Sequence, residues 1–155
     1  MLTVRVDRDP GPSRRAGGDA GSSLLLFPAA VLIVLVLGAI AVDLSAVHLA
    51  KRQVLDLAAS AANDAVTAGL DQGRFRTTGE YVIDPTLAAE AVEQAVATNE
   101  PDGRTTVVRV EIGPGPGQVT VELTAPAERV FAPALPGDPG ATTVTGTATA
   151  TALGA

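Results

Sequence analysis

An unbroken apolar run of nineteen residues, 24–42, constrains the fold of this chain more than any other part of its sequence. The run carries no charged side chain, and thirteen of its residues are Leu, Ile, Val or Phe. As an α-helix it rises about 28 Å, which is close to the ~30 Å hydrocarbon core of a bilayer. We therefore expect a transmembrane helix over residues 22–42, with Pro28 near its start, where a missing N–H costs little.

Two other structures could use the same run. Arg14 and Arg15, the apolar stretch and the small residues Ala39-Ile40-Ala41 are together typical of a secretory signal cleaved after Ala41. The run is longer than the ~7–15 residues usual in such a signal, and the helical pattern continues beyond it, so an uncleaved anchor is favoured. A buried helix of a soluble core is disfavoured, because the run is apolar on every face and the remaining chain is too small to enclose it.

The charges on either side of the run predict its orientation. Four arginines precede it, whereas Lys51 and Arg52 follow it, and the positive-inside bias then favours a cytoplasmic N-terminus at the plasma membrane. Residues 1–21, rich in Gly, Pro, Arg and Asp, are expected to be a disordered cytoplasmic tail. Residues 43–155, expected to be extracytoplasmic, hold 14 acidic and 7 basic side chains, which argues against nucleic acid as a partner.

The helical pattern does not end with the apolar run. Residues 43–68 contain neither proline nor glycine, and apolar and polar side chains recur there every three to four positions. We expect an extracytoplasmic helical stalk over residues 43–70 that continues the transmembrane helix. Small side chains allow another helix or a sheet to approach closely, and they predict a helix-docking face made of Ala41, Ser45, Ala58, Ala61, Ala62 and Ala65.

Residues 71–155 are expected to form a small α+β head. Its first part is predicted to be a loop over 71–79 and a short strand over 80–83. A helix then begins after Asp84, a suitable N-cap, with Pro85 at its first position, and ends near Asn99. Leu87 is expected on the buried face of this helix. Residues 126–140, with four prolines and two glycines, are predicted to be an irregular loop.

Alternating side chains predict three antiparallel strands, over residues 105–112, 118–124 and 143–152. The outer half of the long helix is expected to cover the apolar face of this sheet, which would be marginal alone. The predicted fold is therefore α+β, with a long N-terminal helix, a second helix and a small three-stranded antiparallel sheet. The strand positions expected to face inward are Val108, Val110, Ile112, Val119, Val121, Leu123, Val144, Gly146, Ala148, Ala150 and Ala152.

No group of side chains in the sequence predicts catalysis or metal binding. His48 is the only histidine, the chain lacks cysteine, and Glu90 and Glu93 form an i, i+3 pair expected on a solvated helix face. Asp43 is expected to act as the polar cap at the outer end of the span. With few aromatic side chains to line a pocket, we expect no cofactor and no small-molecule substrate.

The N-terminal half of the chain resembles a known family. The segments that carry the resemblance lie between residues 14 and 70: Gly21-Ser-Ser before the apolar run, Ala41-Val-Asp at its end, and Lys51-Arg-Gln-Val-Leu-Asp-Leu-Ala-Ala-Ser-Ala-Ala beyond it. In this order they are similar to the TadE/TadG family of pilin-like proteins from the Tad (Flp pilus) assembly and secretion machinery. The resemblance implies a pilin-like fold and a non-catalytic, single-pass component whose partners are the lipid bilayer and, through the stalk, other membrane or pilus-assembly proteins.

One departure from the family pattern concerns processing. Members matured like prepilins carry a glutamate at the fifth position after the glycine of the cleavage site, which for cleavage between Gly21 and Ser22 is Leu26. A buried glutamate in a pilin span seeks a partner charge, and its absence argues against stacking into a pilus shaft. The chain is therefore more similar to the unprocessed, TadG-type branch. The alternative function is an envelope-anchored binding module unrelated to pili.

Overall fold

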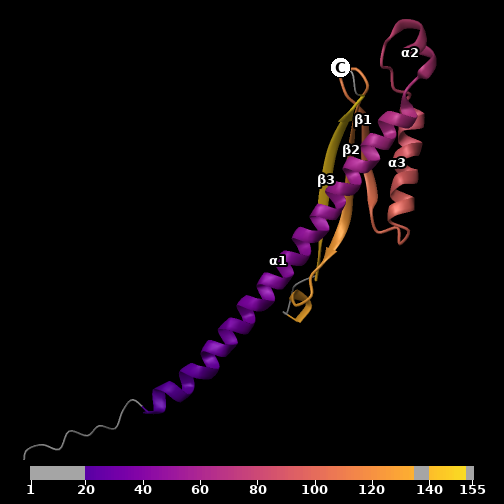
Figure 1. Cartoon of the computed structure of the whole chain (residues 1–155). Coiled ribbons are helices and arrows are strands. Elements are labelled where there is room, and N and C mark those ends of the chain that lie inside the picture. Colours follow the sequence, from indigo (N-terminus) through magenta and orange to yellow (C-terminus); the bar gives the residue numbers. More distant parts are fainter. Residues whose placement is uncertain (1–19, 135–139, 153–155) are drawn as a thin grey trace, which may run out of the picture. The chain divides into compact units, whose positions relative to one another are not determined.

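The computed structural model describes residues 20–134 and 140–152. Its elements, in chain order, are α1 (Ala20–Gly69), α2 (Gln72–Thr78), α3 (Pro85–Asn99), β1 (Thr106–Ile112), β2 (Gln118–Glu128), the 3-10 helix η1 (Ala132–Ala134) and β3 (Ala141–Thr151) (Figure 1). The strands form one antiparallel sheet in the order β1-β2-β3. The predicted α+β fold, with its long N-terminal helix and three-stranded sheet, is confirmed.

The chain divides into two compact units, Met1–Leu37 and Gly38–Ala155, and α1 contributes to both. In the first unit the described residues, 20–37, all belong to α1. Residues 1–19 of the predicted tail lie outside the described residues. In the second unit, α1 shares one hydrophobic core with α3 and the sheet. The predicted division between a stalk over 43–70 and a head over 71–155 is therefore not a boundary between compact units.

Small residues allow α1 to lie directly against the sheet. Ala58, Ala61, Ala62 and Ala65 have no exposed surface and belong to the same core cluster as the buried side chains of β2 and β3. On β3, a Cβ built at Gly146 would lie 2.8 Å from the carbonyl carbon and oxygen of residue 54 in α1. The predicted small-residue face of the third strand thus contacts the helix backbone itself, and the outer half of the long helix covers the sheet, as expected.

A short helix, α2, occupies the segment that was predicted to be a loop. Asp71 caps its start by accepting a hydrogen bond at Oδ1 from the Arg74 N–H (3.0 Å), and Gly79, with a φ of 75°, ends it. The loop prediction was wrong because an aspartate and a glycine eight residues apart cap both ends of a helix. The strand predicted over 80–83 was also wrong, since only Ile83 forms a bridge, with Leu70.

The predicted start and end of the second helix are confirmed by α3. Asp84 accepts hydrogen bonds at Oδ1 from the N–H groups of Thr86 (2.8 Å) and Leu87 (3.3 Å), and Pro85 is the first helical residue. The side chains that α3 buries are Ala88, Val92, Ala95 and Val96. Leu87, predicted on the buried face, is exposed because, at about 100° per residue, it lies outside the arc of the helix that holds these four buried residues.

A β-bulge changes the inward face of β1. Val107 pairs with Leu123 and Arg109 with Glu122, so the intervening Val108 has no residue opposite it. Val107 and Val110 pack against the core, whereas Val108 is exposed. The prediction that Val108 faces inward was therefore wrong, because one extra residue in a strand shifts the alternation before it to the opposite face.

The central strand β2 is longer than predicted. Val119, Val121 and Leu123 are fully buried, as expected, but the strand continues to Glu128 through Pro126, which was assigned to an irregular loop. Pairing with β1 ends at Thr124, so β2 is an edge on that side when it reaches Pro126, which pairs only with Thr143 of β3. A proline without an N–H is tolerated at such an edge, and its presence was a poor signal for a loop.

Candidate functional site

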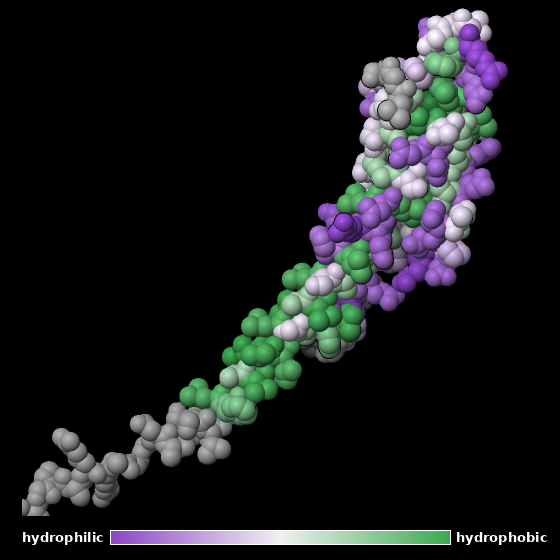
Figure 2. Space-filling view, in the orientation of Figure 1, coloured by the Kyte–Doolittle hydropathy of each residue, from purple (hydrophilic) through white to green (hydrophobic). Residues whose placement is uncertain are grey.

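The apolar stretch of α1 is uncovered by the rest of the chain. Between residues 26 and 37 its large side chains are between 43% and 73% exposed, the extremes being Val31 and Phe27. Figure 2 shows these residues in green along the N-terminal part of the helix. Among the described residues α1 is the one helix long and apolar enough to cross a membrane, and the apolar window is 0% buried. A core helix of a soluble protein would be covered, so that alternative is disfavoured; a membrane span and a signal sequence both fit.

Asp43, directly after this stretch, binds a distant loop. Its Oδ1 accepts hydrogen bonds from the N–H groups of Val130 (2.7 Å) and Phe131 (2.9 Å), and its Oδ2 accepts one from the N–H of Ala132 (2.8 Å). The loop connects β2 to η1, almost ninety residues away in the chain. The expectation that Asp43 is only a polar cap for the span was thus incomplete: the carboxylate fastens the loop to α1.

The same hydrogen bonds control the charge of Asp43. The N–H of Phe131 is the largest cause that lowers the pKa of this carboxyl below its ordinary value of 3.8, followed by the N–H groups of Val130 and Ala132 and by the positive charge of Arg129. Partial desolvation opposes them but does not reverse the direction. Asp43 is therefore an anion at neutral pH, held by three oriented dipoles.

The predicted helix-docking face divides into a buried part and an exposed part. Ala58, Ala61, Ala62 and Ala65 lie inside the second unit against the chain's own core, so they are not free to dock another protein. Their small side chains allow α1 to lie close to the sheet of the same chain, so they do not form part of an exposed docking face. Ala41 and Ser45 remain exposed, and the Ser45 hydroxyl donates to the carbonyl oxygen of Ala41 (2.7 Å).

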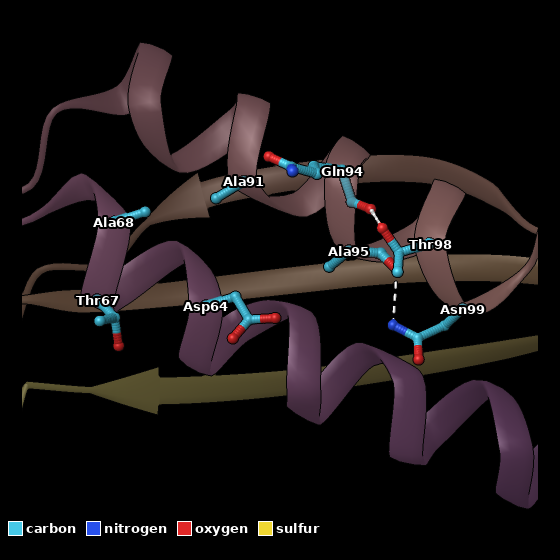
Figure 3. A pocket seen from close by; sticks show the side chains of 8 residues that line it. All are labelled: Asp64, Thr67, Ala68, Ala91, Gln94, Ala95, Thr98 and Asn99. Carbon is cyan, nitrogen blue, oxygen red and sulfur yellow. Dashed lines mark hydrogen bonds between the residues drawn. The ribbon is translucent and has the colours of Figure 1, made fainter.

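A shallow groove of about 410 Å³ lies between α1 and α3 (Figure 3). The Thr98 hydroxyl donates to the carbonyl oxygen of Gln94 and the Asn99 amide to that of Ala95, both at 2.8 Å, so these side chains serve their own helix. A binding site would need polar groups that converge on a ligand. The groove carries no recognisable chemistry, and its lining residues are Asp64, Thr67, Ala68, Ala91, Gln94, Ala95, Thr98 and Asn99.

The other residues singled out in the sequence do not come together. His48 is exposed on α1, and Glu90 and Glu93 are exposed on α3. Within residues 20–134 and 140–152 there is no cluster of three or more His, Asp or Glu residues that could hold a metal ion. Gly21 and Ser22 lie in the first turn of α1, and processing between them stays a prediction.

The part of the candidate site that sequence reasoning missed is the loop bound by Asp43. Its residues Val130 and Phe131 stood within a segment dismissed as irregular, and their exposure next to the apolar end of α1 depends on the fold. The one local signal was the adjacent pair of large apolar residues in a segment otherwise rich in Pro, Ala and Gly. Comparison of the chain with protein families, with curated proteins and with solved structures finds no match.

Proposed function

We propose that this chain is a single-pass, non-catalytic membrane protein, a pilin-like accessory component of a Tad-type (Flp) pilus assembly or secretion system. One observation carries the proposal: the same helix, α1, is apolar and uncovered over its first half and is the central core helix of an α+β head over its second half. The segments similar to the TadE/TadG family lie along this helix and support the choice of system.

The proposed mechanism is physical rather than chemical. The apolar stretch anchors the chain in the plasma membrane, with the N-terminus in the cytoplasm and the acidic head outside. Since Ala58, Ala61, Ala62 and Ala65 are covered by the chain's own core, we assign the contact with other membrane or pilus proteins to residues 41–49, the part of α1 next to the apolar run. That surface includes the exposed side chains of Leu44 and Leu49.

A crosslinking experiment in the native host tests the proposal. A photo-reactive residue at Leu49 should capture Tad-type pilus or secretion proteins, whereas the same residue at the exposed Leu87 of α3 should not. Alkali washing of the membranes should leave the chain in the pellet. A chain found only in the soluble fraction would contradict the anchor, and an anchored chain without pilus-protein adducts would favour the envelope-anchored binding module.

Mapping of the N-terminus in membrane-extracted protein distinguishes the three processing states. A start near Met1 fits the unprocessed anchor that we propose. A start at Ser22 indicates pilin-type maturation, and a start at Val42 indicates secretion after signal cleavage.

A further inference from the structure

Two large apolar side chains are displayed by the loop that Asp43 binds. Val130 is 62% exposed and Phe131 is 46% exposed. Among the described residues outside α1, Val130 is the most exposed of the large hydrophobic side chains. Single exposed apolar residues are ordinary on protein surfaces, so the pair has meaning only through its position.

The position of the loop is set by Asp43. Its three backbone hydrogen bonds, of 2.7 to 2.9 Å, hold residues 130–132 beside the residue that directly follows the apolar run. The neighbouring α1 side chains Ile40 and Leu44 are exposed and apolar. They line a groove of about 420 Å³ together with Asp43 and Ala132. The exposed apolar side chains of the loop are thus fixed, through Asp43, at the end of the apolar run within the second unit.

We propose that residues 130–133 are a second membrane contact, in which Val130 and Phe131 enter the headgroup region of the bilayer that α1 spans. The inference rests on the proposed function, because it takes residues 24–42 as the membrane span. Asp43 then lies at the edge of the hydrocarbon core, and the loop lies in the interfacial layer, which is roughly 5–8 Å deep on each side. Apolar and aromatic side chains are favoured in that layer.

The hydrogen bonds of Asp43 also suit the loop to this environment. A backbone N–H that leaves water without a partner is costly, and three consecutive N–H groups of the loop are satisfied by the carboxylate. The carboxylate in turn is compensated by those three dipoles and by Arg129 nearby. A lipid surface, rather than a protein, is the occupant indicated by the attachment of the loop to Asp43, directly after the apolar run.

The three phenylalanines of the chain provide a matched experiment. The sequence contains no tryptophan, so Phe27→Trp, Phe75→Trp and Phe131→Trp each create a single tryptophan by the same substitution. Phe27 lies in the apolar stretch, Phe75 in α2, and Phe131 in the loop. Along α1, the start of α2 is about 40 Å from Asp43 at 1.5 Å per residue, so Phe75 is the control outside the membrane. The full-length variants are placed in liposomes of phosphatidylcholine and phosphatidylglycerol that carry nitroxide labels at shallow or deep positions.

The expected result is a graded loss of fluorescence. Trp emission from F27W should be quenched most by deep labels, that from F131W most by shallow labels with a blue shift, and that from F75W by neither. Asp43→Asn in the F131W background should reduce the shallow quenching, because it releases the loop.

Three outcomes overturn three different statements. If F131W behaves like F75W while F27W is quenched, the loop does not contact lipid although the span stands. If F27W is also unquenched, the proposed membrane anchor fails. Unchanged quenching in the Asp43→Asn background would show that this carboxylate does not place the loop.

Discussion

At the residue scale, one carboxylate and one missing side chain have effects out of proportion to their size. Asp43 satisfies three N–H groups of a loop almost ninety residues away, so a single side chain joins α1 to the connection between β2 and β3. Gly146 has no Cβ, and this allows β3 to approach the backbone of α1 at that position. Neither residue is distinguished from other helix or strand positions by the sequence around it.

The contribution of Asp43 to stability should depend on pH. Hydrogen bonds in the folded state lower the pKa of Asp43 below its unfolded value of about 3.9. The carboxylate therefore contributes fully to the free energy of unfolding when the pH is above about 3.9, and this contribution is lost as the pH falls through the folded pKa. Asp43→Asn should reduce stability at pH 7 and make it fall less steeply below pH ~4. Urea unfolding of the detergent-solubilised chain, followed by the fluorescence of its single tyrosine, Tyr81, measures this. Asp56→Asn on the exposed face of α1 is the matched control, and an equal effect there would contradict the role of Asp43.

Adding one methyl group at Gly146 should destabilise the head. The Cβ of Gly146→Ala would lie 2.8 Å from helix backbone atoms that cannot turn aside, so overpacking should cost about 1–3 kcal/mol of unfolding free energy. Gly115→Ala is the control, because its Cβ would meet its nearest neighbour, the Gln118 side chain, at an ordinary 3.5 Å. The same urea titration compares the two. Equal stabilities would mean that helix and strand separate at little cost.

At the scale of elements, α1 performs two tasks that require different sequences. Its first half is apolar on all sides, which suits lipid, whereas its second half is apolar on one stripe, which suits a core covered on one side. The strands also depend on their context. Pro126 is accommodated because β2 extends beyond β1, and the bulge at Val108 lets β1 keep both Val107 and Val110 on the core.

Two arginines in the apolar stretch should release the chain from the membrane. Leu32 and Leu35 are exposed in the first unit, so Leu32→Arg with Leu35→Arg leaves the packed core untouched. Each arginine costs about 2.5–3.5 kcal/mol of insertion free energy, which together cancels much of the roughly 4–8 kcal/mol supplied by the thirteen large apolar residues. Alkali extraction of cell membranes should move the double variant to the soluble fraction. Leu32→Val with Leu35→Val should remain in the pellet; retention of both would contradict insertion through this stretch.

At the scale of the whole molecule, the head is not complete without half of the long helix. The second compact unit begins at Gly38, and the buried residues of α1 cover the fully buried Val119, Val121 and Leu123 of β2 within one core cluster. A three-stranded sheet that lacks such a cover is marginal in water. The apolar stretch and the core-forming half are therefore both parts of α1.

Truncation tests this dependence directly. A fragment of residues 38–155 retains the second unit and should unfold cooperatively in urea, with the helical circular dichroism of α1 and α3. A fragment of residues 71–155 loses the α1 part of the core and should be unfolded or aggregated. Cooperative unfolding of the shorter fragment would show that the sheet and α3 form a core of their own.

The sequence by itself determined the apolar stretch of α1, the start of α3 at Asp84 and the buried alternation of Val119, Val121 and Leu123. Each of these depends on side chains within a few positions of one another, where helix and strand periods and local caps act. The same local rules contained the evidence for α2, since Asp71 and Gly79 cap it, although that segment was predicted to be a loop.

Only the tertiary structure decided which residues of α1 and β3 touch, where β1 bulges, and which loop Asp43 binds. These features depend on contacts between residues far apart in the chain. A carboxylate in a helix can accept hydrogen bonds from any N–H group that the fold places near it. The periodicity of side chains along the sequence does not identify that N–H group. The apolar helix of the candidate site could therefore be predicted from the sequence. The loop bound by Asp43 could not, because its place depends on the fold.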